Sequence, residues 1–237
     1  MLAAGKSTRL YPLTLELPKC LLAVGDKTIL DHQVESLVAN GIKELVIVVG
    51  YHKQKIIDHL AEKNYPITIT YIENDQYERN GPIIGGLRLV RNYLHEPLLF
   101  FHCDVLFTTD AIATLLANPN ESVLLYRRGV WDEEAGKIIV DAEGRVQELG
   151  KHIDMNRASG EYAQIAKFGA DFCERLVTIV DERLIAGRDG YTIDAFNDVV
   201  QDSSIHALGL PFGGFLMEID TTEDYAAAQK VWGEQNL

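Results

Sequence analysis

The first twenty residues place a turn of small residues close to two cations. Leu2-Ala3-Ala4-Gly5 is apolar and small, and Arg9 and Lys19 follow it at short offsets. Small residues let a backbone turn approach a ligand closely, and successive N–H groups in such a turn bind anions. A guanidinium suits bidentate contact with phosphate, whereas an ammonium acts as a point charge. The segment predicts a triphosphate-binding loop, and an ordinary polar loop after a first strand is the alternative.

In this prediction Arg9 contacts the β and γ oxygens and Lys19 reaches the α-phosphate. The backbone that cradles the phosphates is expected to come from Leu2, Ala3, Ala4, Gly5, Lys6, Ser7 and Thr8.

Strand and helix patterns alternate along the next hundred residues. Apolar or β-branched runs predict strands over 44–50, 67–72, 98–102 and 122–126. Helical spacing and capping residues predict helices over 29–39, 53–63, 82–93 and 110–117. Strands joined through helices imply right-handed crossovers, and therefore a mostly parallel α/β sheet with helices on both faces.

The rhythm changes after Arg127. A hairpin is expected from strands 137–141 and 145–149, which flank Ala142-Glu143-Gly144. Further strands are predicted over 161–168 and 214–219, with helices over 171–185, 192–201 and from 221 or 222 to about 233. We expect one domain over 1–237, with a small β-rich insert over about 128–204 that covers the acceptor side.

Charge and composition exclude several classes of protein. The net charge is −13, whereas nonspecific nucleic-acid binding needs a basic footprint. No apolar run reaches the roughly 20 residues that span a bilayer, and no signal peptide is recognisable. Three scattered cysteines predict neither a disulfide framework nor a zinc site. We expect no nucleic-acid or membrane partner and a reducing cytoplasm.

Three acidic residues end two of the predicted strands. Asp104 follows the 98–102 strand, and Glu218 and Asp220 close the 214–219 strand. Residues two apart on a strand point to the same face, so Glu218 and Asp220 can converge on one cation. Oxygen ligands together with triphosphate oxygens suit Mg²⁺. The alternative is that these acids cap the helices that follow.

Candidates for the two substrates lie further along the chain. A base could contact Asn80 and the Gly81 backbone, although a capped turn would account for the same residues. In the insert, the candidates for the acceptor pocket are Lys137, Lys151, Glu161, Tyr191 and Asp194. Lysine can hold a phosphate and acids can hold an ammonium, but solvated or packed side chains are the alternative for each of them.

The opening loop resembles the signature of the sugar-phosphate nucleotidyltransferase superfamily. The segments Glu218–Tyr225, Asn74-Asp75-x-Tyr77 and Gly150–Tyr162 are similar to bacterial choline-phosphate and aminoethylphosphonate cytidylyltransferases. The resemblance implies a Rossmann-like fold, a nucleoside triphosphate with CTP favoured, a small phosphorylated acceptor and Mg²⁺. It also implies that Asp104, Glu218 and Asp220 are the metal ligands, and that Lys151, Glu161 and Asp194 fall in acceptor-side segments.

The chain departs from the family pattern at three places. It begins at Met1-Leu2, where relatives have more strand residues, so a short first strand is expected. His102 and the segment Gly81–Gly86 also differ from the choline enzymes. These departures leave the base and the acceptor open, but not the reaction class, and the sequence does not reveal the oligomeric state. The alternatives are a sugar-1-phosphate nucleotidyltransferase and a non-catalytic nucleotide-binding regulatory subunit; the presence of both cations and all three acids argues against the latter.

Overall fold

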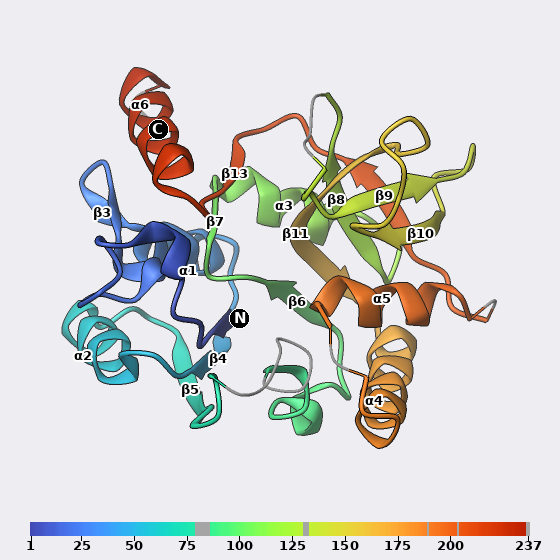
Figure 1. The fold of residues 1–237 in the computed structure, drawn as a ribbon, viewed down its shortest axis with the longest axis horizontal. Coiled ribbons are helices and arrows are strands. Elements are labelled where there is room, and N and C mark those ends of the chain that lie inside the picture. The colour runs from blue at the N-terminus through green and yellow to red at the C-terminus, as the bar shows by residue number, and fades with distance from the viewer. Residues whose placement is uncertain (79–85, 130–132, 189, 203, 236–237) are drawn as a thin grey trace. The chain divides into compact units, whose positions relative to one another are not determined.

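A computed structural model describes residues 1–78, 86–129, 133–188, 190–202 and 204–235 (Figure 1). The chain divides into two compact units, which are described separately. Unit 1 comprises Met1–Tyr77, Phe101–Thr114 and Gly214–Leu237, and unit 2 comprises Glu78–Phe100 and Leu115–Gly213.

Unit 1 contains a parallel sheet in the order β1-β4-β5, formed by β1 (Leu2–Ala3), β4 (Glu44–Val49) and β5 (Thr68–Glu73). Leu2 pairs with Val48 on one side and forms a parallel bridge with His102 on the other. The chain after β6 (Leu98–Phe101) therefore continues this sheet beside β1. Because parallel strands end at the same edge, the opening loop and Asp104 emerge next to each other.

Two helices of unit 1 follow from clear local signals. α1 (Ile29–Ala39) begins with a capping box, in which Thr28 Oγ1 accepts a hydrogen bond from Asp31 N and the Asp31 carboxylate accepts one from Thr28 N. α2 (Lys53–Lys63) buries Ile56 and Leu60, one turn apart on the same face. A short hairpin of β2 (Ala23–Val24) and β3 (Lys27–Thr28) precedes α1.

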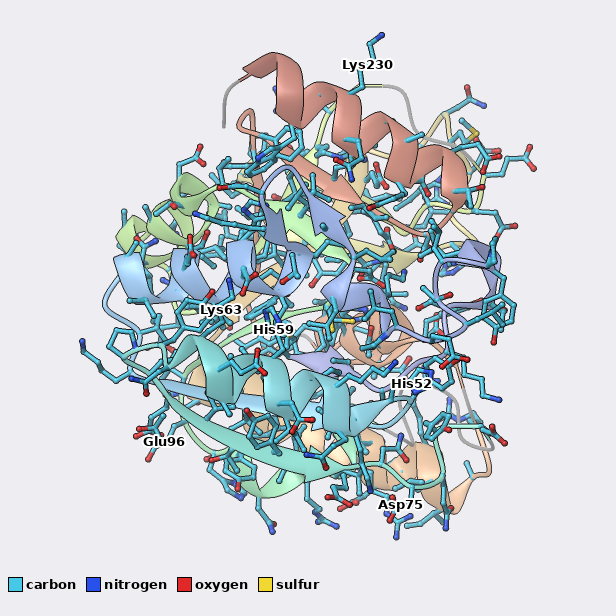
Figure 2. All side chains as sticks on the ribbon, turned by 90° about the vertical axis from the view of Figure 1, so that its left-hand side faces the viewer. His52, His59, Lys63, Asp75, Glu96 and Lys230 are labelled. Carbon is cyan, nitrogen blue, oxygen red and sulfur yellow. The ribbon has the colours of Figure 1, made fainter. Side chains whose placement is uncertain are left out.

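The Asp31 carboxylate also ties α1 to the α2 region. Its side chain is 1% exposed. It accepts hydrogen bonds from Tyr65 Oη at 2.7 Å and His59 Nε2 at 2.8 Å, and Lys63 Nζ lies 3.4 Å away. In Figure 2 the labelled His59 and Lys63 lie between the ribbons of these two helices. Burial raises the pKa of Asp31, but the hydrogen bonds from Tyr65, His59 and Thr28 lower it by more, to well below its usual range.

The remaining elements of unit 1 bring distant segments together. β7 (Val105–Phe107) pairs antiparallel with β13 (Leu216–Glu218), and α6 (Thr222–Gln235) follows β13 (Figure 1). α3 (Thr109–Ala117) follows β7. Trp232 of α6 packs against the His32 ring of α1, with ring centroids 4.2 Å apart.

Unit 2 is built on a mixed sheet in the order β10-β9-β11-β8-β12, and β6 also pairs with β11. These strands are β8 (Val123–Arg127), β9 (Lys137–Val140), β10 (Val146–Gly150), β11 (Gly160–Phe168) and β12 (Leu208–Pro211). α4 (Ala170–Ile185) and α5 (Thr192–Val200) also belong to this unit. Phe168 stacks on Phe172 with centroids 4.2 Å apart, and both rings contact Phe196 in the core.

The predicted α/β fold class is confirmed, and most predicted elements are present with ends that shift by one or two residues. β7, β12 and the β2–β3 hairpin were not predicted, because each of these strands is only two to four residues long. The sheet of unit 2 extends beyond 128–204 on both sides, through β8 and β12. In the predicted helix 82–93, the described part contains the 3-10 turn Arg91–Tyr93, and residues 82–85 lie outside the described residues.

Among the described residues, no helix combines the length and the apolar character needed to cross a membrane.

Candidate functional site

The pairing of β7 with β13 brings the three predicted acids together. Val105, directly after Asp104, is the register partner of Glu218, and Ile219 N donates to Asp104 O at 2.9 Å. One ligand atom each from Asp104, Glu218 and Asp220 lies within 4.8 Å of the others. Sequence positions more than a hundred residues apart therefore meet in one carboxylate cluster.

Asp104 uses its two carboxylate oxygens differently. Oδ2 accepts a hydrogen bond from Lys19 Nζ at 3.1 Å. Oδ1 is buried and has no hydrogen-bond partner among the residues that the structure describes. A buried carboxylate oxygen without a donor is costly in the absence of a compensating cation or water. This atom is therefore a good candidate for a metal ligand.

Lys19 is a buried cation held between two of the acids. Its side chain is 6% exposed, and Nζ also donates to Asp220 Oδ1 at 2.6 Å. Burial lowers the pKa of the Lys19 ammonium, but the charges of Asp104 and Asp220 raise it by more, so the net pKa lies above its ordinary value. Lys19 consequently remains charged throughout the neutral range.

Arg9 lies on the short 3-10 helix η1 (Thr8–Leu10). Its Nη2 donates to Asp220 Oδ2 at 2.6 Å, while 63% of its side chain is exposed. Burial raises the pKa of Asp220, but Lys19 and Arg9 together lower it below its usual value. Asp220 is therefore ionised at neutral pH, and the exposed guanidinium beside it remains accessible to an anion.

The opening loop is anchored at both ends. Ser7 has a positive φ of 52°, and its carbonyl oxygen accepts from Leu10 N and Thr14 Oγ1. Tyr51 donates its backbone N–H to Ala4 O at 3.1 Å, and its hydroxyl donates to Leu15 O at 2.6 Å. The sequence analysis did not single out Tyr51, although its place directly after the strand-ending Gly50 is a signal for such a role.

The loop leaves space next to its backbone. A Cβ added to Gly5 would meet no atom within 4 Å among the described residues. Leu2 and Ala3 belong to β1, so the turn itself starts at Ala4 and continues through Gly5, Lys6 and Ser7 to Thr8 at the start of η1. The open space over Gly5 fits the expectation that a ligand approaches the backbone here.

The charges of the cluster fit a divalent cation. Three carboxylates against Arg9 and Lys19 give a formal charge of −3 + 2 = −1. A set of carboxylate oxygens with residual negative charge is the environment that Mg²⁺ takes in nucleotide enzymes. The residues present therefore fit a magnesium ion that would be held by Asp104, Glu218 and Asp220.

The candidate base contacts Asn80 and Gly81 lie outside the described residues. Earlier in the chain, in the turn after β5, Asn74 is buried and its Oδ1 accepts a hydrogen bond from Gln76 N at 3.1 Å.

Two of the three acceptor candidates in unit 2 have local partners. Glu161 Oε2 accepts from Arg127 Nη2 at 2.5 Å, across the β11–β8 pair. Asp194 Oδ2 accepts from the backbone N–H of Tyr191 at 2.7 Å and caps α5. Both carboxylates thus stabilise the unit itself.

The third candidate, Lys151, has a different environment. Its Nζ lies 4.3 Å from the centroid of the Tyr191 ring and 3.6 Å from Glu134 Oε2. It lines a hollow of about 640 Å³ together with Glu134, His152, Asp154 and the buried Lys137, among others. Lys137 donates to the carbonyl oxygens of Glu133, Ala135 and Lys151, and so fixes one wall of this hollow.

Comparison with known proteins places the chain in a family. Residues 1–158 match the family model of the MobA-like NTP transferase domain, which is two-thirds of the chain. The chain therefore belongs to this family, and it is a nucleotidyltransferase.

Individual relatives differ in what they are named for. The choline-phosphate cytidylyltransferase of Streptococcus pneumoniae is 27% identical over 238 residues, which cover 100% of this chain and 98% of that protein. A UTP–glucose-1-phosphate uridylyltransferase of Haloferax volcanii is 32% identical over 154 residues, covering 63% of this chain and 62% of its own length. The solved structure of CTP:phosphocholine cytidylyltransferase from Streptococcus pneumoniae has a TM-score of 0.78 at 24% identity, and covers 97% of this chain and 96% of that one.

Proposed function

We propose that this protein is a Mg²⁺-dependent cytidylyltransferase that transfers CMP from CTP to a small phosphorylated amino alcohol or phosphonate and releases pyrophosphate. The observation that carries the proposal is the convergence of Arg9, Lys19 and three carboxylates in one cluster of unit 1. Phosphoryl and nucleotidyl transfer depend on positioning and charge neutralisation, and this cluster supplies groups of both signs for them.

The transfer is a single displacement. An oxygen of the acceptor's phosphate or phosphonate forms a bond to the α-phosphorus of the triphosphate, and the bond from that phosphorus to the bridging oxygen breaks, so pyrophosphate leaves in line. A phosphomonoester has a second pKa of about 6, so its attacking oxygen is already largely ionised at neutral pH. No side chain is therefore needed to remove a proton from the acceptor.

The residues of the cluster take separate roles in this proposal. Asp104, Glu218 and Asp220 would hold the magnesium ion, which would supply positive charge to neutralise phosphate oxygens. Lys19 contacts the α-phosphate as a buried point charge. Arg9, which is more exposed, contacts the β- and γ-phosphates.

The acceptor is assigned to unit 2, with Lys151 as the main contact. Lys151 lines the hollow and presents an ammonium that can pair with the acceptor's phosphate or with another anionic group on it. Glu161 and Asp194 are proposed as further acceptor contacts. They rank below Lys151 because each carboxylate already has a local hydrogen-bond partner.

The choice of CTP and of an amino-alcohol phosphate is supported by the full-length similarity to a choline-phosphate cytidylyltransferase. A sugar 1-phosphate is the second candidate acceptor, because a relative named for glucose 1-phosphate and UTP has the higher identity over a shorter stretch.

The test is pyrophosphate release with Mg²⁺, CTP, UTP, GTP or dTTP, and a panel of acceptors. The panel contains phosphocholine, phosphoethanolamine, 2-aminoethylphosphonate, glucose 1-phosphate and mannose 1-phosphate. Release with CTP and one of the first three acceptors supports the proposal. Release only with a sugar 1-phosphate moves the protein to the sugar branch. Triphosphate binding without release from any pair would contradict a catalytic role toward these acceptors.

A further inference from the structure

Gln33 is a fully buried polar residue on α1. Its Nε2 donates to His102 O at 2.9 Å and to Val105 O at 2.8 Å. These two carbonyl groups flank the two-residue stretch Cys103-Asp104 on either side. A single side chain therefore spans the segment that presents Asp104.

The chemistry of the contact requires an amide nitrogen. Both neighbouring groups are carbonyl oxygens, which only accept hydrogen bonds, so the donor end of the Gln33 amide must face them. Its Oε1 is buried and has no hydrogen-bond partner among the described residues. The unpaired oxygen costs free energy. The Gln33 amide nitrogen therefore hydrogen-bonds both carbonyl groups around Asp104, while its amide oxygen is left without a hydrogen bond among the described residues.

Backbone hydrogen bonds also support this segment. Cys103 N donates to Leu2 O at 3.1 Å, and Asp104 O accepts from Ile219 N at 2.9 Å. Such pairings with β1 and the end of β13 do not depend on residue type. Gln33 connects the same segment to α1. Its side chain hydrogen-bonds the backbone on both sides of Asp104.

We propose that Gln33 is a positioning residue for the metal site: it fixes the 102–105 backbone so that the Asp104 carboxylate stays directed at Glu218 and Asp220. This inference rests on the proposed function, in which those acids hold the divalent cation. Groups that orient metal ligands without touching the metal typically contribute about 10- to 100-fold to metal affinity.

The test is Mn²⁺ binding to the whole protein without substrates, measured by the electron paramagnetic resonance signal of free Mn²⁺. Gln33→Met removes both donors at nearly constant length and volume. We expect it to weaken Mn²⁺ binding by about 10-fold or more. Excess Mn²⁺ should restore part of the lost pyrophosphate release, which an unfolded protein would not show.

Asn40 provides a matched control. Its Nδ2 also donates to two carbonyl groups, those of Ser36 and Thr109, at the other end of α1 and away from the carboxylate cluster. Asn40→Leu should lower the thermal midpoint but leave Mn²⁺ affinity within about twofold. If Gln33→Met does not fold, Gln33→Asn replaces it, because its amide is one methylene shorter and cannot bridge both carbonyl groups.

The outcomes separate the two claims. Wild-type protein that binds no Mn²⁺ overturns the proposed metal site, and this inference with it. Wild-type binding together with unchanged binding in a folded Gln33 variant overturns the positioning role alone. Weaker binding in the Gln33 variant and unchanged binding in Asn40→Leu supports it.

Discussion

The charged residues of the two units behave differently. In unit 1, Arg9 and Lys19 come from the opening segment and the three acids from two other segments, yet all five form one network of short contacts. In unit 2, Glu161 and Asp194 each pair with a neighbour on an adjacent strand or within one helical turn. Charges that converge from distant segments indicate a site, whereas charges satisfied locally indicate stability.

The contrast has a physical cause. Bringing two cations and three carboxylates together with partial burial costs desolvation, and folding stability alone does not require it. A surface ion pair or a helix cap costs little and contributes a modest stabilisation. The following predictions test whether this distinction separates catalytic from structural charges.

The largest effect is expected from Lys19→Met. The substitution keeps the length of a buried side chain and removes the charge between Asp104 and Asp220. Loss of one preorganised group that stabilises transition-state charge costs roughly 10²- to 10³-fold in kcat. Steady-state pyrophosphate release measures this, and far-UV circular dichroism checks the fold. Turnover within threefold of wild type in a folded variant would remove Lys19 from the mechanism.

Asp104→Asn should reduce turnover by roughly 10²-fold and raise the Mg²⁺ concentration at half-maximal rate, because a neutral amide replaces a charged metal ligand. The variant retains the size of the side chain. Magnesium titration of the reaction rate is the measurement, and Asp110→Asn, an exposed acid at the start of α3, serves as the control. An unchanged magnesium requirement would argue that Asp104 only supports Lys19.

Smaller and divergent effects are expected in unit 2. Lys151→Ala should raise the acceptor KM by about 10-fold, the value of one charge-assisted contact of about 1.4 kcal/mol. Asp194→Ala should raise the acceptor KM by less than Lys151→Ala does, and it should lower the free energy of unfolding by about 1 kcal/mol through loss of the α5 cap. Acceptor KM and urea unfolding measured on both variants give the comparison. If Asp194→Ala raises the acceptor KM as much as Lys151→Ala does, local pairing does not exclude a site role.

Asp31 tests the distinction within unit 1, because it is buried and highly paired but lies outside the carboxylate cluster. Its pKa is lowered in the folded state, so its ionised form contributes stability above its unfolded pKa of about 3.9, and this contribution is lost as the pH falls below that value. Asp31→Asn should lower stability at pH 7 and flatten the loss of stability as the pH falls below about 4. Urea unfolding at several pH values is the measurement. A wild-type curve with the same pH dependence as the variant would contradict the role of Asp31.

Much of the site could be predicted from sequence because its residues sit at recognisable strand ends. Asp104 follows an apolar run, and Glu218 and Asp220 share the spacing of one strand face, so both sets of acids could be placed at strand ends from the sequence. Lys19 could be assigned to phosphate, but its burial between two acids depends on tertiary contacts.

The remaining features of the site depend on strand pairing and on hydrogen bonds between distant segments, which the sequence pattern does not reveal. Strand β7 is three residues long, too short for a periodicity signal, although its pairing with the predicted 214–219 strand brings the acids together. Gln33 and Tyr51 act through hydrogen bonds to backbone groups far along the chain, and such partners cannot be deduced from residue type. The partners of Glu161 and Asp194, which are Arg127 and the Tyr191 backbone N–H, were not predicted from the sequence.

The central claim is that unit 1 holds a divalent cation on Asp104, Glu218 and Asp220. The most direct measurement is crystallography with Mn²⁺ and a non-hydrolysable CTP analogue, with data collected at the manganese absorption edge. We predict an anomalous peak in contact with all three carboxylates, about 2 Å from the coordinating oxygens. The proposed cation site would be contradicted if the triphosphate bound with manganese elsewhere and these carboxylates paired only with Arg9 and Lys19.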